Sequence, residues 1–345
     1  MKKIVFDIIH LAHINFFKNA INFLHNKGYK IEIIYLDRGK IEKVLKKELP
    51  NYKITKIGSY SKTTFGKIFM ILDRAIKLNR YLKNSKPDST AGVGDFILAF
   101  SSRIKKIPSI IFYDDFEFKL NFNLSHFFGN KLIIPDSIPA KGKKIIKYHG
   151  FKELAYLHPK IYKPKKSIIV KMGLKENNYV FAREVAGISM NYSNLKKDSL
   201  LKYIKYIKNK GIKIILSLED KSRKEIYAPY CTILEEPLED LYSIMSYARF
   251  SISSGDSMAR ESALLGVQCI YTGGRYMAVN KPLIFWKGIY KIENEKKIIA
   301  EIDKLFDKKV KHTWSLRIKK KINEGLADTT QIITNQIITS LLKKE

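Results

Sequence analysis

The chain has 345 residues, of which 45% are hydrophobic and 28% charged, a composition that fits two folded domains and excludes a disordered or fibrous protein. The formal net charge is +31, which points to anionic partners such as nucleotide sugars, acidic lipid surfaces or nucleic acid. An alternative is a lysine-rich genome with lysines spread over solvated surfaces. Basic residues are scattered and no zinc-finger or aromatic RNA-binding motif occurs, so no specific nucleic-acid partner is predicted.

The two cysteines, Cys231 and Cys269, give neither a disulfide framework nor metal-site spacing, which favours a reducing compartment. The first 17 residues resemble a signal peptide, but Asp7, His10 and His13 interrupt the apolar run and no cleavage site follows. We expect a buried strand over residues 3–9 instead. No apolar run long enough to span a membrane occurs, so we predict a cytoplasmic protein, whose charge also suits the inner face of the membrane.

Strand and helix patterns alternate along the first half of the chain. Such alternation predicts a parallel sheet covered on both faces by helices. The strand patterns cover 2–9, 30–36, 89–96, 108–115 and 130–136, the last closing the series, and the helix patterns cover 14–28, 66–88 and 97–107.

A basic segment with two prolines, 158–167, is the best candidate linker, and a second alternating series follows it. We therefore predict two doubly wound, Rossmann-like α/β domains that face a cleft and cover 1–160 and 161–310. A helical tail over 311–345 is expected to pack back on the first domain. The second series has strand patterns at 179–185, 212–219, 249–253 and 267–273, and helix patterns at 195–211, 237–248 and 326–344.

The stretch "SSGDSMARESALLG" (253–266) joins a strand to a helix through a turn of small residues. A helix N-terminus binds phosphate through its unpaired N–H groups, and Ser254, Gly255 and Ser257 allow close approach. Glu261 lies one turn beyond Ser257 on the same helix face, where its carboxylate could accept ribose hydroxyls. The alternative is a solvent-facing Glu261 paired with Arg260, behind an ordinary helix cap.

Three stretches together resemble the prokaryotic domain-of-unknown-function family 354: "SSGDSMARESALLGVQCI", "YHGFKELAYLHP" (148–159) and "FDIIHLAHINFFKN" (6–19). Members look like two-domain GT-B glycosyltransferases and like UDP-N-acetylglucosamine 2-epimerases, and the resemblance runs over about residues 3–290. It bears strongly on the fold and weakly on the reaction. It implies an acceptor domain followed by a nucleotide-sugar domain, with Gly255 and Ser257 at phosphate and Glu261 at ribose.

The chain departs from this family at Asp256, where a second glycine is usual. An aspartate suits a helix N-terminus but repels a diphosphate. The side chain could turn away as a cap, a metal ion could bridge it, the donor could be a monophosphate sugar such as a CMP-sugar, or donor binding could be lost.

Other candidate residues lie at predicted strand ends. His13 is the histidine that recurs in the family, and its imidazole could accept a proton from an acceptor hydroxyl; alternatively it is bonded to backbone at the helix entry. The placement of Asp95 and Asp115, with Asp114 and Glu117, resembles the carboxylates that transfer protons in the 2-epimerases. They could equally balance nearby lysines.

Arg183, near the end of the second domain's first strand, could bind phosphate in a bidentate manner. The epimerases carry a histidine in that region which this chain lacks. Gly273, Gly274 and Arg275 form a turn that could cover a donor sugar or be a plain turn. No octahedral ligand set is evident, so no metal is predicted. No cofactor is predicted either, because the nucleotide sugar is a co-substrate.

These observations predict a GT-B-like glycosyltransferase that moves a sugar from a nucleotide donor to a hydroxyl acceptor in surface glycan or glycolipid synthesis. The expected donor is a UDP-sugar, with a CMP-sugar as alternative, and the expected acceptor is a glycan or a lipid-linked molecule. Two other functions stay open: a UDP-HexNAc 2-epimerase, and a non-catalytic anion or nucleotide binder with a degenerate donor site.

Overall fold

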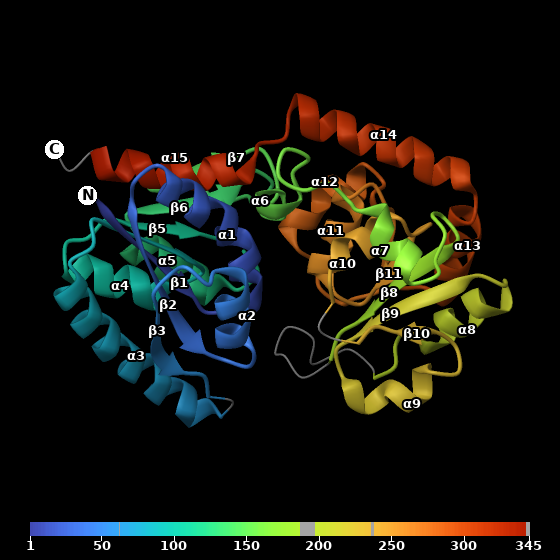
Figure 1. Ribbon diagram of the computed structural model, residues 1–345, viewed down its shortest axis with the longest axis horizontal. Helices are drawn as coiled ribbons and strands as arrows, with labels where there is room; N and C mark the ends of the chain where they lie inside the picture. The colour runs from blue at the N-terminus through green and yellow to red at the C-terminus, as the bar shows by residue number, and fades with distance from the viewer. Residues whose placement is uncertain (62, 187–196, 236–237, 343–345) are drawn as a thin grey trace. The chain divides into compact units, whose positions relative to one another are not determined.

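The computed structural model describes residues 1–61, 63–186, 197–235 and 238–342. The chain forms two compact units (Figure 1). Unit 1 comprises Met1–His158 together with Leu326–Glu345, and unit 2 comprises Pro159–Gly325. The segment 311–345, expected as a single tail, is divided between the two units. Within the described ranges, no helix combines the length and the apolar character needed to cross a bilayer.

Unit 1 is built on a parallel sheet whose strands pair in the order β3-β2-β1-β4-β5-β6-β7. The direction of winding reverses between β1 and β4. The strands are β1 (Lys3–Ile8), β2 (Lys30–Asp37), β3 (Ile54–Ser59), β4 (Ser89–Val93), β5 (Ser109–Phe112), β6 (Lys131–Pro135) and β7 (Ile145–Tyr148).

Helices form a layer on each face of this sheet, as right-handed crossovers require. One layer contains α1, α2, α6 and α15, and the other contains α3, α4 and α5. Their bounds are α1 (Leu11–Asn26), α2 (Ile41–Glu48), α3 (Thr64–Ser85), α4 (Phe96–Ile104), α5 (Lys119–Phe128), α6 (Leu154–Leu157) and α15 (Thr329–Leu342).

Helix α15 belongs to unit 1 although the whole of unit 2 separates it in sequence from the first part of that unit. The Thr329 hydroxyl donates to the Phe151 carbonyl at 2.8 Å, and the Thr330 hydroxyl donates to the Ala155 carbonyl at the same distance. Near its other end the Ser340 hydroxyl lies 3.0 Å from that of Ser89 in β4. The helix is therefore bonded to unit 1 along its length.

Unit 2 repeats the doubly wound plan, with strand order β10-β9-β8-β11-β12-β13 and a reversal between β8 and β11. The strands are β8 (Tyr179–Glu184), β9 (Lys213–Leu218), β10 (Thr232–Ile233), β11 (Ser251–Ser253), β12 (Cys269–Tyr271) and β13 (Ile289–Lys291). The helices are α7 (Lys166–Lys171), α8 (Leu201–Asn209), α9 (Lys224–Tyr227), α10 (Leu241–Ser246), α11 (Asp256–Leu264), α12 (Lys281–Phe285), α13 (Glu295–Leu305) and α14 (Lys308–Glu324), with 3₁₀ turns η1 (Lys221–Arg223) and η2 (Ala278–Asn280).

The predicted α/β fold of two doubly wound domains is confirmed, and each predicted strand pattern contains a strand. The prediction that 130–136 closes the first sheet is wrong, because β7 pairs beyond it. Strands β3, β10 and β13 and helices α2, α5 and α13 were not predicted either, whereas most of α14 lies in the predicted helical tail. The expected helices at 195–211 and 237–248 begin on positions outside the described residues and correspond to α8 and α10.

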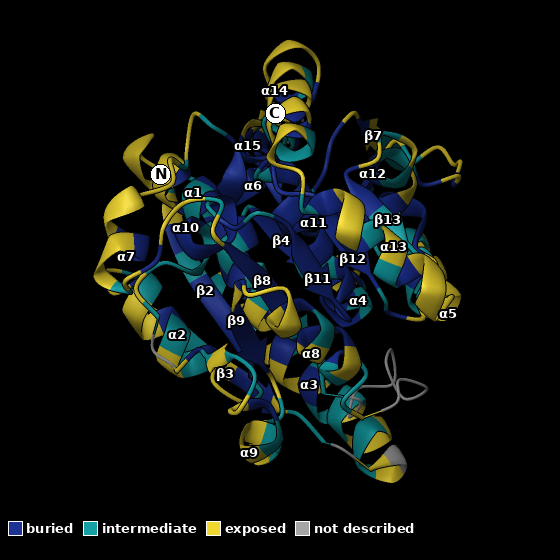
Figure 2. Cartoon of the chain, turned by 90° about the vertical axis from the view of Figure 1, so that its right-hand side faces the viewer, coloured by how far each residue is buried: buried dark blue, intermediate teal, exposed yellow. Residues whose placement is uncertain are grey.

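The strands are runs of β-branched and aromatic residues that become buried on both faces. In β1, Ile4, Val5, Phe6 and Ile8 have no exposed surface, and Figure 2 shows inner strands such as β8 and β11 in the buried colour. In open α/β sheets, ligands bind beyond the carboxyl ends of the strands at the reversal of strand order. The edges after β1 and β4 in unit 1, and after β8 and β11 in unit 2, are therefore the places to look for a site.

Candidate functional site

In unit 2, the turn between β11 and α11 is held by hydrogen bonds at both sides. The Ser253 hydroxyl accepts from the Gly255 N–H at 3.0 Å and donates to the Gly255 carbonyl at 2.7 Å. The Ser254 hydroxyl accepts from the N–H of Val185, just after β8, at 2.9 Å. The turn is thus tied to two strand ends at the reversal of strand order, and the phosphate-binding role predicted for Ser254 and Gly255 stays a prediction.

Two glycines allow neighbouring loops to approach this turn closely. A Cβ on Gly255 would lie 2.7 Å from Cγ1 of Val185. A Cβ on Gly273, in the loop after β12, would lie 2.4 Å from the carbonyl oxygen of Ser254. Real Cβ atoms do not make such contacts, so glycine is required at both positions for the loops after β8, β11 and β12 to close together.

Asp256 is the first residue of α11, and its side chain is buried against two arginines. Its Oδ2 lies 3.2 Å from Nη1 of Arg260, one turn further along, and its Oδ1 lies 3.9 Å from Nη1 of Arg275. Arg260 is fully buried and also donates to Oδ1 of Asn280 at 2.8 Å. Two guanidinium groups therefore lie beside this carboxylate.

One of the explanations offered for Asp256, a helix cap, differs from the structure. The side chain does not cap α11, because the N-cap residue is Gly255 and no side chain caps the helix there. In the described residues no group of three or more acidic, histidine or cysteine side chains could hold a metal ion. The carboxylate is turned into the unit, where the arginines offset its charge.

Glu261 lies one turn along α11 and is 7% exposed. The Tyr242 hydroxyl, from α10, donates to its Oε1 at 3.2 Å. The solvent-facing position expected in the alternative differs from the structure, in which Glu261 is buried. Arg260 pairs with Asp256. Ser257 follows Asp256 in α11, and its Oγ lies 3.4 Å from Nη2 of Arg260. Nothing in the sequence pattern pointed to Tyr242 or Asn280.

Arg183, at the end of β8, is directed toward β9. Its Nη1 donates to the Ser217 hydroxyl at 3.0 Å and its Nη2 donates to Oε2 of Glu219 at 2.9 Å. The guanidinium charge is therefore already matched by a carboxylate. Its predicted role at phosphate stays a prediction.

In unit 1, two histidines lie between β1 and the first turn of α1. His10 is the N-cap residue, and its Nδ1 accepts from the Ala12 N–H at 3.2 Å. His13 lies inside the helix, and its Nδ1 is buried without a hydrogen-bond partner among the described residues. Burial lowers the pKa of His13 well below its usual value, and the His10 and Lys152 side chains add to this effect while Asp114 opposes it. His13 is therefore a neutral imidazole at neutral pH.

The carboxylates predicted for catalysis have different surroundings. Asp95 is buried, and its Oδ1 accepts from the Leu98 N–H at 2.9 Å as the N-cap of α4. Its Oδ2 lies 3.5 Å from Nη2 of Arg74, which also contacts both carboxylate oxygens of Asp7 at 2.6 Å. Burial raises the pKa of Asp7, and Asp95 adds to that rise, while Arg74 opposes it. The contacts of Asp95 stabilise the fold, so its catalytic role stays a prediction.

Asp114 and Asp115 follow β5. Asp114 forms an ion pair with Lys152 at 2.7 Å, and both lie among the groups that act on the pKa of His13. Asp115 is half-buried in the next turn, where its carbonyl accepts from the Phe118 N–H at 3.1 Å. The carboxyl edge of unit 1 thus brings His13, Asp114 and Lys152 together, and sequence reasoning missed the last of these as a neighbour of His13.

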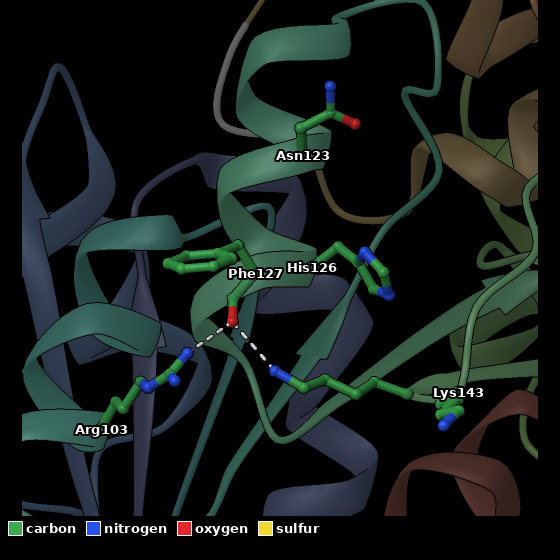
Figure 3. A pocket seen from close by; sticks show the side chains of 6 residues that line it. Arg103, Asn123, His126, Phe127 and Lys143 are labelled. Carbon is green, nitrogen blue, oxygen red and sulfur yellow. Dashed lines mark hydrogen bonds between the residues drawn. The ribbon is translucent and has the colours of Figure 1, made fainter.

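Unit 1 also has a basic hollow of about 610 Å³, which none of the predicted site residues lines. Arg103 and Lys144 donate to the Phe127 carbonyl at 2.8 and 2.9 Å, at the C-terminal end of α5 (Figure 3). Burial and Arg103 lower the pKa of Lys144. Cations at a helix C-terminus stabilise the helix, which accounts for these contacts. The lining residues are Arg103, Asn123, His126, Phe127, Lys143 and Lys144.

Comparison of this geometry with known proteins places the chain in the GT-B class of folds, in agreement with the predicted fold. A UDP-GlcNAc 2-epimerase from Methanocaldococcus jannaschii, solved with UDP-GlcNAc and UDP, matches with a TM-score of 0.70 at 16% identity over 98% of this chain and 99% of that one. The 2-epimerase from Neisseria meningitidis bound to UDP-GlcNAc gives 0.68 at 15% identity over 99% and 100%. MurG from Acinetobacter baumannii gives 0.66 at 17% identity over 98% and 100%.

The chain belongs to the family described as "Protein of unknown function (DUF354)", whose model matches residues 2–341. This confirms the resemblance inferred from the sequence. An uncharacterised protein of Methanocaldococcus jannaschii is 24% identical over 274 residues, which cover 76% of this chain and 80% of that protein.

Proposed function

We propose that this protein is a glycosyltransferase that takes a sugar from a nucleotide donor and transfers it to a hydroxyl acceptor. The observation that carries the proposal is the group formed by Asp256, Arg260 and Arg275 at the N-terminus of α11. Its two guanidinium groups lie at the carboxyl edge of the sheet in unit 2, beside a turn of small residues.

The donor phosphates would bind at the N–H groups that begin α11, where the helix dipole and the arginines favour negative charge. Because the charge of Asp256 is offset, a diphosphate is not excluded, and we propose a UDP-sugar ahead of a CMP-sugar. Glu261 would accept the ribose hydroxyls one helical turn away. The hydrogen bond from Tyr242 holds that carboxylate in place before the donor arrives.

His13 would act as the general base on the acceptor. Its imidazole is unprotonated at neutral pH and can accept the hydroxyl proton as the acceptor oxygen attacks the anomeric carbon. The bond from that carbon to the phosphate oxygen breaks, and the nucleotide leaves with the electron pair. Asp115 is the second candidate for this proton transfer. The acceptor we propose is a glycan or a lipid-linked molecule in surface glycan or glycolipid synthesis.

The structural likeness to 2-epimerases favours one competing function, a UDP-HexNAc 2-epimerase. Such an enzyme needs acid and base groups at the sugar. In this chain Asp95 pairs with Arg74 and caps the start of α4, so fewer acid and base groups are available to an epimerase. Incorporation of solvent deuterium at C2 of the sugar would establish epimerase chemistry and overturn the transferase proposal.

The first experiment is a thermal-shift screen against UDP, GDP, CDP, dTDP, CMP and ADP. A ligand that binds the folded state raises the unfolding temperature by mass action. We expect UDP to stabilise the wild-type protein and the Glu261→Gln variant to lose that response. Glu225→Gln, a change at an exposed glutamate of unit 2, is the matched control. No response to any nucleotide would overturn the proposal, and a response that survives in Glu261→Gln would remove the ribose role of Glu261.

A transfer assay then tests the reaction itself. Purified protein is incubated with the stabilising nucleotide's sugar and with lipid-linked or glycan acceptors, and the release of free nucleotide is measured with and without acceptor. Acceptor-dependent release supports the proposed reaction. Nucleotide binding without turnover, with every acceptor offered, would favour a non-catalytic binder.

A further inference from the structure

The outer face of α3 in unit 1 carries a stripe of large apolar side chains that are exposed to solvent. Their spacing along the helix is i, i+3, i+4, i+7 and i+11, which places them on one face. The members of this stripe and their exposed fractions are Phe65 (88%), Ile68 (57%), Phe69 (73%), Leu72 (59%) and Ile76 (64%).

The opposite face of α3 is firmly attached to the sheet. Arg74 forms the buried contacts with Asp7 and Asp95, and Leu78 and Leu82 are buried in the core of unit 1. The helix therefore cannot roll to hide its stripe without breaking a buried ion pair. A contiguous apolar patch that stays on the surface of a folded unit marks an interaction site.

Cations continue the same face beyond the stripe. Arg80 is four residues after Ile76 and Lys83 is seven after it, so both lie on the stripe's side of the helix. Both are exposed, and neither forms an ion pair within the described part of the chain. The face thus combines a fixed apolar row with unmatched positive charge.

We propose that this face of α3 docks on a bilayer that contains anionic phospholipids. The stripe would enter the interface between headgroups and acyl chains, and Arg80 and Lys83 would contact the headgroup phosphates. Charge complementarity selects this partner over a second copy of the chain. Two copies, each with a net charge of +31, repel each other, whereas the same charge attracts an anionic surface. This inference goes beyond the proposed function and does not depend on it.

The test is vesicle co-sedimentation of the full chain with phosphatidylcholine alone or mixed with phosphatidylglycerol, at low and high salt. We expect binding to the mixed vesicles that high salt weakens. Leu72→Gln should weaken it about tenfold, which corresponds to about 1.4 kcal/mol, because the variant buries less apolar surface in the bilayer. Arg80→Gln should weaken it about fivefold, because each basic residue at such a surface contributes about 1 kcal/mol.

Leu316→Gln is the matched control for Leu72→Gln. Leu316 lies on helix α14 of unit 2 and is 57% exposed, almost the same as Leu72, so its replacement should leave vesicle binding unchanged. The unfolding temperature and the nucleotide response of Leu72→Gln should match those of the wild-type protein, which separates this test from the test of the proposed function.

Three results would overturn the inference. The first is equal binding to neutral and anionic vesicles, and the second is a Leu72→Gln variant that binds like the wild-type protein. The third is a wild-type dimer, seen by analytical ultracentrifugation, that Leu72→Gln converts to a monomer. That result would show that a second copy covers the stripe.

Discussion

Each unit buries arginine with aspartate, but in opposite proportions. In unit 1 one guanidinium, Arg74, serves the two carboxylates of Asp7 and Asp95 beneath the strand ends. In unit 2 two guanidinium groups, Arg260 and Arg275, serve the single carboxylate of Asp256 at a helix N-terminus. The first group has more carboxylates than guanidinium groups, whereas the second has more guanidinium groups than carboxylates. The first holds a helix against the strands of unit 1, and the second is the group on which the proposed donor site rests.

The strongest test of this comparison is Arg74→Met. It would leave two carboxylates buried without a cation, and we expect the free energy of unfolding at neutral pH to fall by about 3 to 5 kcal/mol. The loss should shrink at acidic pH, where the raised pKa of Asp7 allows that carboxyl to be neutral. Urea unfolding measures both effects. Arg80→Met, an exposed change on the same helix, is the control, and equal stability of the two variants would contradict the interpretation.

Gly273→Ala tests the close contact that completes the binding turn of unit 2. The new Cβ would lie 2.4 Å from the Ser254 carbonyl oxygen, so we expect a loss of about 1 to 3 kcal/mol in unfolding free energy and a weaker nucleotide response. Gly274→Ala is a control one residue away, because no atom lies within 4 Å of a Cβ there. Equal unfolding free energies of the two variants in urea would show that the close contact at Gly273 does not stabilise the fold.

A third prediction concerns His13 in unit 1 and the dependence of unfolding free energy on pH. Its pKa is lowered in the folded state, so below about pH 6.5 the unfolded state binds a proton that the folded state does not, and stability falls as the pH falls. One such group contributes at most about 1.4 kcal/mol per pH unit. His13→Gln should flatten the dependence of unfolding free energy between about pH 5 and about pH 7. A profile for His13→Gln that is as steep as that of the wild-type protein, or steeper, would refute the assignment.

The smallest expected effect concerns Asp256. Because two arginines already offset its charge, Asp256→Asn should change the affinity for UDP by no more than about fivefold, which corresponds to about 1 kcal/mol. Isothermal titration calorimetry measures this, with Asp303→Asn on the surface of unit 2 as control. An increase of about a hundredfold, or about 2.7 kcal/mol, would mean that the carboxylate repels the diphosphate after all.

Much of the fold could be predicted because the inner strands are long apolar runs. Strands β1 and β2 contain buried residues on both faces, and no other element suits such segments. Strands β7 and β13 were not predicted because they are short edge strands, "IIKY" and "IYK", in which a lysine interrupts the apolar run.

The candidate site was predictable only where its residues are neighbours in sequence. The small-residue turn before α11 and Glu261 on its first turns follow from local spacing. The partners that decide how these residues behave are distant: Arg275 lies 19 residues from Asp256, and Arg74 lies 67 residues from Asp7. No local pattern reports such pairs, which is why the charge balance at Asp256 and the structural use of Asp95 needed the folded chain.

The bonding of α15 to unit 1 also sets an order of events during synthesis. The ribosome releases residues 159–325 before α15 exists, so unit 2 can fold while unit 1 still lacks a helix of one layer. Until then the part of α1 that α15 covers, and the carbonyls of Phe151 and Ala155, stay open to other molecules in the cell. The nascent chain therefore completes its first domain last, and this interval is when unit 1 is most exposed to aggregation and proteolysis.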